Sequence, residues 1–412
     1  MSASPASVIT RCATRATPAG DDLIAALPRA TGALCFVQGG AGLVGWGQHA
    51  TITVTAPDAA EQIARWYAWQ LEQIVVADDI QAPGSGPVCF VSLGFSPDDP
   101  SVAVIPQTVL GRVDGVSFVT IIGERPALRD PSAVTAPGQV RYGDAALSAT
   151  GFTAAVARAI DRIRAGEAAK VVLAHGLQAT TQHPVDERYL LARLARRYPS
   201  CAAFAVGGLV GASPEMLIRR RGLAVTSRVL AGTAWPDATG DDTPPRVAAH
   251  LLASAKDLGE HAFAVQSVAD ALKAVTDALD VPARPSALGL ANLTHLATDI
   301  SGTLAPDRDV PSVLELAALL HPTAAVGGTP TDVALRMIAE LEPDARGRYA
   351  APVGWLDSRG DGEFAIALRC AEVSGTSVRL MAGCGIVADS DPATEAREAQ
   401  IKMVPVRDAL EG

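Results

Sequence analysis

The chain has 412 residues, 49% of them hydrophobic, and a formal net charge of −10 at pH 7. Its basic residues are scattered rather than clustered, which argues against a nucleic-acid partner, because phosphate binding requires a positive patch. No run of 18 apolar residues exists and the N-terminus lacks a continuous apolar stretch, so we expect a cytoplasmic protein with no membrane partner and no signal peptide.

Residues 1–140 are predicted to consist of strands and loops with two helical stretches, at 22–27 and 58–74. The runs GALCFVQGGAGLVGWG and PVCFVSLGFS are short, apolar and interrupted by glycine, which is typical of buried strands and turns. The second helical stretch, within DAAEQIARWYAWQLEQIVV, has its apolar residues at helical spacing.

From residue 145 onward long helices alternate with strands. KVVLAHGLQAT, AAFAVGGLVGAS and EMLIRRRGLAVTS read as strands, and residues 347–387 read as a three-strand meander with turns at DSRGDG and VSGTS. No low-complexity linker separates 1–140 from 145–410, so we predict a single domain over 1–412 in which the N-terminal part pairs with the rest. The helices expected in the second part lie at 149–165, 185–197, 245–278, 310–319 and 331–341.

Near the C-terminus, the tripeptide SDP at 390–392 predicts a helix start, because Ser or Asp can accept hydrogen bonds from the first turn and Pro fits the first helical position. On the following helix Glu395, Glu398 and Lys402 are spaced i, i+3, i+7 and share one face. This face is either a solvated surface or part of a site.

A second predicted helix carries the same acidic spacing, with Asp257 and Glu260 in SAKDLGEHAFAV. Two such helices could meet around one divalent cation, and oxygen ligands with few protein carboxylates are what Mg²⁺ prefers. Zinc is disfavoured, because DLGEH has Asp257 where the H-x-x-E-H motif has its first histidine. Two ordinary amphipathic helices remain the alternative.

Other positions also suggest chemistry. Glu215 follows Pro214 at a turn between two strands, where a solvated carboxylate is the alternative. The segment GEFAIALRC predicts that Arg369 lies inside an apolar strand, where it must be paired or reach a cleft. The Gly/Pro/Thr loop at 321–331 opens a helix and could bind an anion.

The lysines and cysteines are also informative. The six cysteines are far apart and form no C-x-x-C pair, which predicts reduced, buried thiols. Of 34 basic residues only Lys170, Lys256, Lys273 and Lys402 are lysines. A desolvated lysine can lose its proton, whereas arginine cannot, so we expect roles for Lys170 and Lys402, which lie in motif-like segments.

The segments KVVLA, SPE, LAGT, KDLGEH, LHPTAAVGGTPT, FAIALR and AGCGIV followed by E-x-x-E-x-x-x-K occur in this order. Together they resemble the chorismate-utilising enzymes and are most similar to the isochorismate synthases among them. The resemblance covers roughly residues 145–410, and 1–140 match as the variable part of the same fold. It implies a large single α/β (α+β) domain with two stacked antiparallel sheets flanked by helices.

The resemblance also implies a reaction, in which water adds at C2 of chorismate and the C4 hydroxyl leaves. Lys170 matches the family's base and Glu215 its acid, so we expect both side chains to be partly desolvated. Glu260 and Glu398 match its Mg²⁺ ligands, with Asp257 and Glu395 beside them. The positions that match substrate-binding residues are Gly232, Thr233, His295, Thr323, Tyr349, Arg369, Gly383 and Lys402.

Comparison within the family favours water over ammonia as the nucleophile. Anthranilate synthases, which add ammonia at C2, usually lack a lysine at the position of Lys170, and the VLAGT segment has Ala231 where aminodeoxychorismate synthases have a nucleophilic lysine, so no glutaminase subunit is expected. We also expect the protein to be a monomer. A salicylate synthase, which continues to pyruvate elimination, and a non-catalytic chorismate-binding homologue are the alternatives. The chain departs from the family at His175, where Arg is more common, and at Val229, where Pro often precedes LAG.

Overall fold

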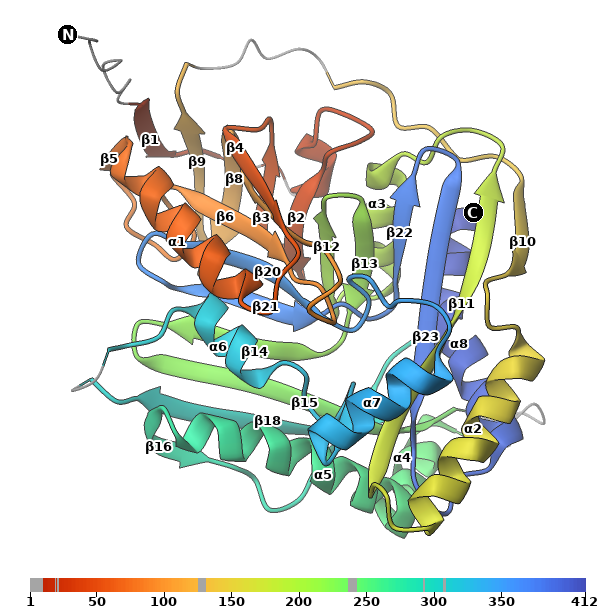
Figure 1. Cartoon of the computed structure of the whole chain (residues 1–412). Helices are drawn as coiled ribbons and strands as arrows, with labels where there is room; N and C mark the ends of the chain where they lie inside the picture. The colour runs from red at the N-terminus through yellow and green to blue at the C-terminus, as the bar shows by residue number, and fades with distance from the viewer. Residues whose placement is uncertain are drawn as a thin grey trace, which may run out of the picture.

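The computed structural model describes residues 10–18, 20, 22–124, 131–235, 243–291, 293–306 and 309–412. Apolar and alternating runs form two large β-sheets (Figure 1). The strands of the first sheet are β1 (Thr10–Ala16), β2 (Leu34–Gln38), β3 (Ala41–Trp46), β5 (Ile74–Asp78), β8 (Thr108–Val113), β9 (Val116–Ile122), β10 (Val140–Asp144), β11 (Lys170–Thr181), β12 (Ala202–Val206), β13 (Leu209–Ser213), β19 (Gly328–Thr329), β22 (Cys370–Ser374) and β23 (Ser377–Ile386).

These strands follow the order β10-β11-β23-β22-β13-β12-β2-β3-β8-β9-β1-β5, with β19 also paired to β11. Neighbouring strands are antiparallel except β1 and β5, which are parallel. The strand that begins with Lys170, β11, pairs along most of its length with β23 from the end of the chain. The C-terminal strand therefore lies in the interior of this sheet.

The second sheet is antiparallel and has the order β16-β18-β15-β14-β21-β20-β6-β7-β4, with β17 beside β18. It packs against the first sheet, because β12 lies against β6, β7 and β20. Its strands are β4 (Ala50–Val54), β6 (Val88–Ser92), β7 (Ser101–Ile105), β14 (Met216–Arg221), β15 (Ala224–Ala234), β16 (Thr276–Asp280), β17 (Ser286–Gly289), β18 (Thr294–Leu304), β20 (Pro352–Asp357) and β21 (Gly362–Ile366).

In both sheets a block of strands from the first part of the chain lies beside a block from the second part, and the two blocks join at one strand pair. In the first sheet β2 pairs with β12, and in the second β6 pairs with β20. One hydrophobic cluster includes Phe36, Phe90, Phe204 and Trp355, which come from these four strands. The predicted fold class, two stacked antiparallel sheets flanked by helices, is thus confirmed.

Helices cover the sheets from outside (Figure 1). Helix α5 packs on β15 and β18, α7 on β11, and α8 along β23. None of the described helices is long and apolar enough to cross a membrane. The helices are α1 (Ala59–Glu72), α2 (Ala149–Arg164), α3 (Glu187–Arg197), α4 (Pro244–Ala253), α5 (Ala255–Lys273), α6 (Val313–Leu320), α7 (Thr331–Leu341) and α8 (Pro392–Glu411), with a short 3-10 helix at Ile24–Ala26.

Two predictions of secondary structure are wrong. The single helix expected at 245–278 is two helices, α4 and α5, which meet at Ser254, and its last residues begin β16. The Ser254 hydroxyl accepts the N–H of Asp257 and caps the second helix, a local bond that competes with helix continuation.

The C-terminal segment 347–387 forms four strands instead of a three-strand meander. β20 and β21 belong to the second sheet, whereas β22 and β23 belong to the first. The chain crosses between the sheets at 367–369. Arg369 therefore lies in a crossover and not inside a strand, and its backbone has φ 50°, the left-handed conformation that suits a sharp change of direction.

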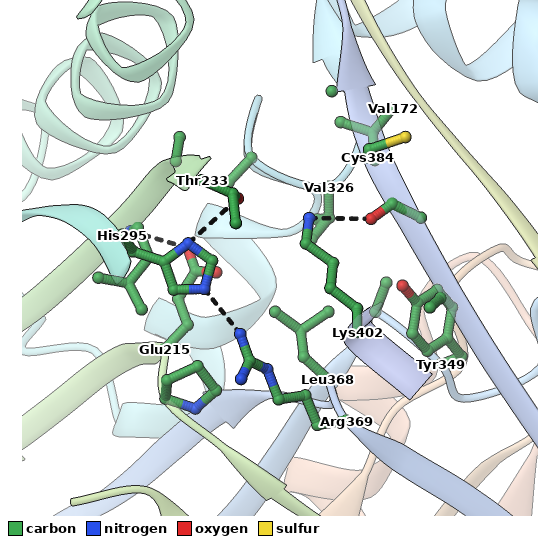
Figure 2. Close-up of a pocket in the computed structure, with 18 of the residues that line it drawn as sticks. Val172, Glu215, Thr233, His295, Val326, Tyr349, Leu368, Arg369, Cys384 and Lys402 are labelled. Atoms are coloured by element: carbon green, nitrogen blue, oxygen red, sulfur yellow. Dashed lines mark hydrogen bonds between the residues drawn. The ribbon is translucent and has the colours of Figure 1, made fainter. Parts of the chain in front are cut away.

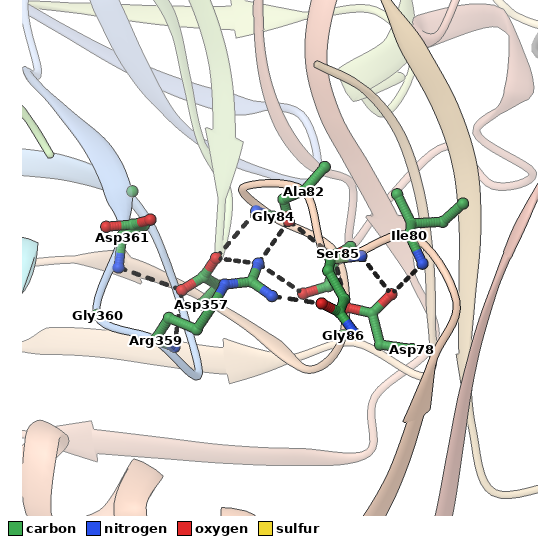
Figure 3. Close-up of polar contacts among 12 residues, drawn as sticks. Asp78, Ile80, Ala82, Gly84, Ser85, Gly86, Asp357, Arg359, Gly360 and Asp361 are labelled. Carbon is green, nitrogen blue, oxygen red and sulfur yellow. Dashed lines mark hydrogen bonds and ion pairs between the residues drawn. The ribbon is translucent and has the colours of Figure 1, made fainter. Parts of the chain in front are cut away.

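A polar network fixes the turn between β20 and β21 to the segment after β5 (Figure 3). The Asp357 carboxylate accepts N–H groups of Gly84 at 3.1 Å and Asp361 at 3.1 Å and pairs with Arg359 at 2.7 Å. Arg359 also lies 3.6 Å from Asp78.

All six cysteines are buried and unpaired, as predicted.

Candidate active site

A pocket opens where the chain passes from one sheet to the other. Two crossovers form part of its wall, Pro214–Glu215 between β13 and β14 and Leu368–Arg369 between β21 and β22. The rest of the lining comes from β11, β15, β18, β23, α5, α8 and the loops around 325 and 349. Residues that are far apart in sequence therefore meet here (Figure 2).

The pocket brings together most of the predicted site residues. Lys170 lies beside it, against Glu260, while Thr323, Asp257, Glu395 and Glu398 are not part of the lining. Thr323 is buried, and its hydroxyl accepts the N–H of Ala325, which does line the pocket. The predicted residues in the lining are Glu215, Gly232, Thr233, Glu260, His295, Tyr349, Arg369, Gly383 and Lys402.

Glu215 is buried at the crossover, only 4% exposed, so the alternative of a solvated turn carboxylate is wrong. Its N–H donates to the Ser213 hydroxyl at 3.2 Å, and its Oε1 accepts the N–H of Leu230 at 3.4 Å. Desolvation raises the pKa of Glu215 to about 7, although Lys170 and the Leu230 N–H oppose the shift. A carboxyl group with this pKa can hold and release a proton near neutral pH.

Lys170 has no exposed surface, as its predicted desolvation requires. Its Nζ lies 3.3 Å from Glu260 Oε1 and has no hydrogen-bond partner among the described residues. Gly385 on the neighbouring β23 makes room for this pair, since a Cβ there would lie 2.1 Å from Glu260 Oε1 and 2.8 Å from Lys170 Cε. The Lys170 Nζ is thus buried beside the pocket with one ionic contact within the described residues.

Arg369 enters the pocket from the crossover and is 6% exposed. Its Nη2 lies 2.7 Å from His295 Nε2, whereas its Nη1 has no hydrogen-bond partner in the part of the chain that the structure describes. Burial first, and then the charge of Arg369, lower the pKa of His295 well below its usual range. The neutral ring donates from Nδ1 to the Gly232 carbonyl at 3.1 Å, so Nε2 accepts from Arg369.

Gly232 needs its glycine, because φ is 73° and an added Cβ would lie 3.1 Å from that of Asp257. On the opposite wall Lys402 donates to the Gly383 carbonyl at 3.0 Å. Burial opposes the charge of Lys402, but the Glu398 carboxylate at 2.6 Å raises its pKa on balance. Arg369 and Lys402 therefore give the pocket a positive lining.

The two acidic helices do approach each other. Burial first, and then Glu260 and Glu398, raise the pKa of Asp257, which places carboxylates of α5 and α8 within electrostatic reach. Burial and then Glu398 likewise raise the pKa of Glu395, although Lys256 opposes the shift. The ion pair between Lys256 of α5 and Glu395 of α8, at 2.8 Å, joins the two helices directly.

Three of these carboxylates are paired with lysines. The N–O distances are 3.3 Å for Lys170–Glu260, 2.8 Å for Lys256–Glu395 and 2.6 Å for Lys402–Glu398. Within the described residues no group of three or more His, Cys, Asp or Glu side chains is arranged around a metal position. The acidic cluster is thus neutralised largely by three of the four lysines, whereas Lys273 pairs with exposed Asp270.

Sequence reasoning missed Arg346, which lines the pocket, and its buried partner Glu342. The only signal in the sequence was their i, i+4 spacing. Both residues follow the end of α7, and outside a helix this spacing does not imply contact. It also missed the apolar lining from Val172, Leu230 and Val326, whose place depends on strand order.

Comparisons with known proteins find relatives over most of the chain. The profile of a family described as "Chorismate binding enzyme" matches residues 126–411. "Isochorismate synthase DhbC" of Bacillus subtilis (strain 168) is 42% identical over 258 residues, 60% of this chain and 64% of that protein, so the match spans less than two thirds of this relative. "Putative isochorismate synthase MenF" of Mycobacterium tuberculosis (strain ATCC 25618 / H37Rv) is 36% identical over 343 residues, 79% of this chain and 87% of that protein.

Two solved structures are similar over nearly the whole chain. The DhbC structure from Bacillus anthracis has a TM-score of 0.78 and 29% identity, covering 94% of this chain and 98% of that one. The structure of MenF, the menaquinone-specific isochorismate synthase from Escherichia coli, has a TM-score of 0.78 and 27% identity, covering 97% and 94%.

Proposed function

Because the chain belongs to the chorismate-binding enzyme family, we propose that it is an isochorismate synthase, an isomerase that converts chorismate to isochorismate. The names of its similar relatives support this reaction. We further propose that it acts in the cytoplasm as a monomer. We also propose that it needs no glutaminase subunit, since Ala231 lines the pocket where aminodeoxychorismate synthases have a nucleophilic lysine.

The observation that carries the proposal is the buried Nη1 of Arg369, which has no hydrogen-bond partner among the residues that the structure describes. A buried N–H without a hydrogen-bond partner costs free energy, so this group calls for an anionic ligand. Chorismate carries two carboxylates, and Arg369 would bind one of them with Tyr349 beside it. A bidentate carboxylate contact would satisfy Nη1 and fix the orientation of the ring.

The proposed chemistry moves one water in and one water out. Lys170 accepts a proton as the oxygen of water bonds to C2, the two ring double bonds shift, and the C4–oxygen bond breaks as Glu215 donates its proton to the leaving hydroxyl. The pKa of Glu215, about 7, favours this role, because an ordinary glutamate is ionised at neutral pH.

We propose that Glu260 and Glu398 hold Mg²⁺. Their oxygen donors fit this ion, which needs one or two protein carboxylates and completes its shell with water and substrate. Burial first, and then neighbouring carboxylates, raise the pKa values of Asp257 and Glu395, and a divalent cation would relieve the repulsion between these carboxylates. Bound Mg²⁺ would neutralise charge on the ring carboxylate of the substrate.

The test is to incubate the purified protein with chorismate and Mg²⁺ in ¹⁸O-labelled water and to identify products by liquid chromatography and mass spectrometry. We expect isochorismate with one solvent oxygen, because the new hydroxyl comes from water. Salicylate with pyruvate would identify a salicylate synthase. Binding of chorismate without any product would identify a non-catalytic homologue, and unlabelled isochorismate would exclude water as the nucleophile.

A further inference from the structure

Among the strands that the structure describes, none pairs with strand β11, which begins with Lys170, along part of one of its edges. On that side Lys170 and Val171 pair with β19, and the register with β10 begins only at Leu177. Within the described residues the stretch 172–176 has no strand beside it on this edge. Helix α7 packs here against β11, near where Figure 1 shows β11 between β23 and β10.

A buried ion pair fills this gap. Arg346 Nη2 donates to the Val172 carbonyl at 2.7 Å, and Glu342 Oε1 accepts the N–H of Ala174 at 2.8 Å. The two side chains bind each other at 2.6 and 2.9 Å and are 3% and 8% exposed. Together they give β11 the acceptor and the donor that a neighbouring strand would supply.

Arg346 also fixes a second wall of the pocket. Its Nη1 donates to the Val326 carbonyl at 2.8 Å, and its guanidinium lies 4.3 Å from the centre of the Phe95 ring. Val172 and Val326 both line the pocket (Figure 2). Each of the three nitrogens of Arg346 is thus bonded to protein, in contrast to Arg369, whose Nη1 has no partner in the described part of the chain.

We propose that Arg346, held by Glu342, is a positioning residue. It fixes the Lys170 end of β11 relative to the part of the pocket wall that contains Val326. Lys170 and Val172 point to the same face of the strand, so a shift of the Val172 carbonyl moves the Lys170 side chain relative to the substrate. This inference rests on the proposed function, in which Lys170 receives the proton of water.

The test compares Arg346→Lys with the wild type. Lysine keeps the charge but is not a planar fork, so it cannot bind the Val172 and Val326 carbonyls and Glu342 together. We expect kcat to fall about 10- to 100-fold, the effect of a misplacement of about 1 Å, while the Kd for chorismate stays nearly unchanged because Arg369 and Lys402 remain. Hydrogen exchange without substrate should accelerate at 172–176.

Two further variants keep the test decisive. Glu342→Gln retains an oxygen for the Ala174 N–H but loses the charge that holds Arg346, so it should show a smaller fall in kcat. Arg188→Lys is the matched control, because Arg188 is equally buried, pairs with Asp186 at 2.7 Å and lies outside the pocket lining. It should lower the melting temperature and leave kcat unchanged.

The outcomes separate this inference from the proposed function. Faster exchange at 172–176 with unchanged kcat, or unchanged exchange, would overturn the positioning role. So would a Glu342→Gln protein that does not fold, because the pair would then serve folding itself. If the wild type made no isochorismate, the proposed function would fail, while the exchange data would still report on the strand edge.

Discussion

At the scale of single residues, the candidate site depends on where charge is buried. Glu215 and Lys170 were expected to be desolvated, and both are, with 4% and 0% exposure. The sequence supported this expectation because Glu215 and Lys170 occupy the acid and base positions of the motifs. It could not show that Lys170 would pair with Glu260, because that contact joins β11 to α5 and depends on Gly385 of a third element.

The first prediction at this scale concerns Lys170→Arg. Guanidinium remains protonated near neutral pH and cannot accept a proton from water. We expect kcat to fall about 10²- to 10⁴-fold, the usual worth of a general base, with chorismate binding retained through Arg369. Stopped assays for kcat and calorimetry for Kd would measure this. Near wild-type turnover would leave Lys170 only an electrostatic role.

The second prediction concerns the pH dependence that Glu215 imposes on turnover. As an acid it must be protonated, so kcat should fall roughly tenfold per pH unit above its pKa of about 7. A profile measured from about pH 6 to about pH 9 would show this limb. If the residual turnover of Glu215→Gln still fell at alkaline pH in the same way, the fall would have to be assigned to another group.

The same group should affect stability. Its pKa is raised in the folded state from an ordinary 4.5 to about 7, so its contribution is fully present below about pH 4.5 and is lost as pH rises through about 7. Above that range Glu215→Gln should be more stable than the wild type, by up to about 3 kcal/mol. Urea unfolding at acidic and alkaline pH would measure the difference. A difference that does not depend on pH would contradict the assignment.

At the scale of elements, helix ends that are set by local residues were predicted correctly, whereas interruptions between elements were not. Helix α7 has the predicted bounds 331–341, and α8 begins at Pro392 as expected, because Pro and the Asp391 cap act locally. The break between α4 and α5 was missed, since LLASAKDL continues the helical spacing and only the Ser254 cap interrupts it. The division of 347–387 between two sheets was missed because sheet membership is decided by distant partners.

A prediction at this scale concerns the acidic faces of α5 and α8. Glu398→Gln and Glu260→Gln should each weaken Mg²⁺ binding by more than about 10- to 100-fold, the loss seen when only a supporting partner of a ligand is removed. Calorimetric titration with MgCl₂ would measure the affinity, with Asp270→Asn as control, since Asp270 lies on α5 but is exposed. Wild-type Mg²⁺ affinity in both Gln variants, or full activity in EDTA, would refute a Mg²⁺ site between α5 and α8.

At the scale of the whole molecule, the pocket exists because the chain changes sheets twice at one place. The residues at those crossovers, Glu215 and Arg369, were identified from sequence, but the crossovers were not. Composition and spacing predict strands one at a time, and the stacking of two sheets is a property of all of them. Family membership, by contrast, was predicted from motifs that occur in the same order along the chain. The match of the family profile confirms it.

The prediction at this scale concerns the network around Asp357. Asp357→Ala removes the acceptor for Gly84, Arg359 and Asp361, so it should lower the free energy of unfolding by roughly 2–4 kcal/mol without changing kcat. Arg336→Ala, which breaks the exposed Arg336–Asp332 pair, should cost less than about 1 kcal/mol. Urea unfolding compares the two. Equal losses in both variants, or a fall in kcat, would refute a purely structural role.

The pairing of β11 with β23 also has a consequence for biosynthesis. Val171 pairs with Ile386, so at about 5–20 residues per second a ribosome needs roughly 10–40 s after making the first to make the second. During that time β11 is translated but has an open edge, to which other nascent chains can add. Helix α8, with Lys402 and Glu398, emerges later still. Activity can therefore appear only after β23 and α8 have been translated, and a protein shortened before β23 should aggregate rather than work slowly.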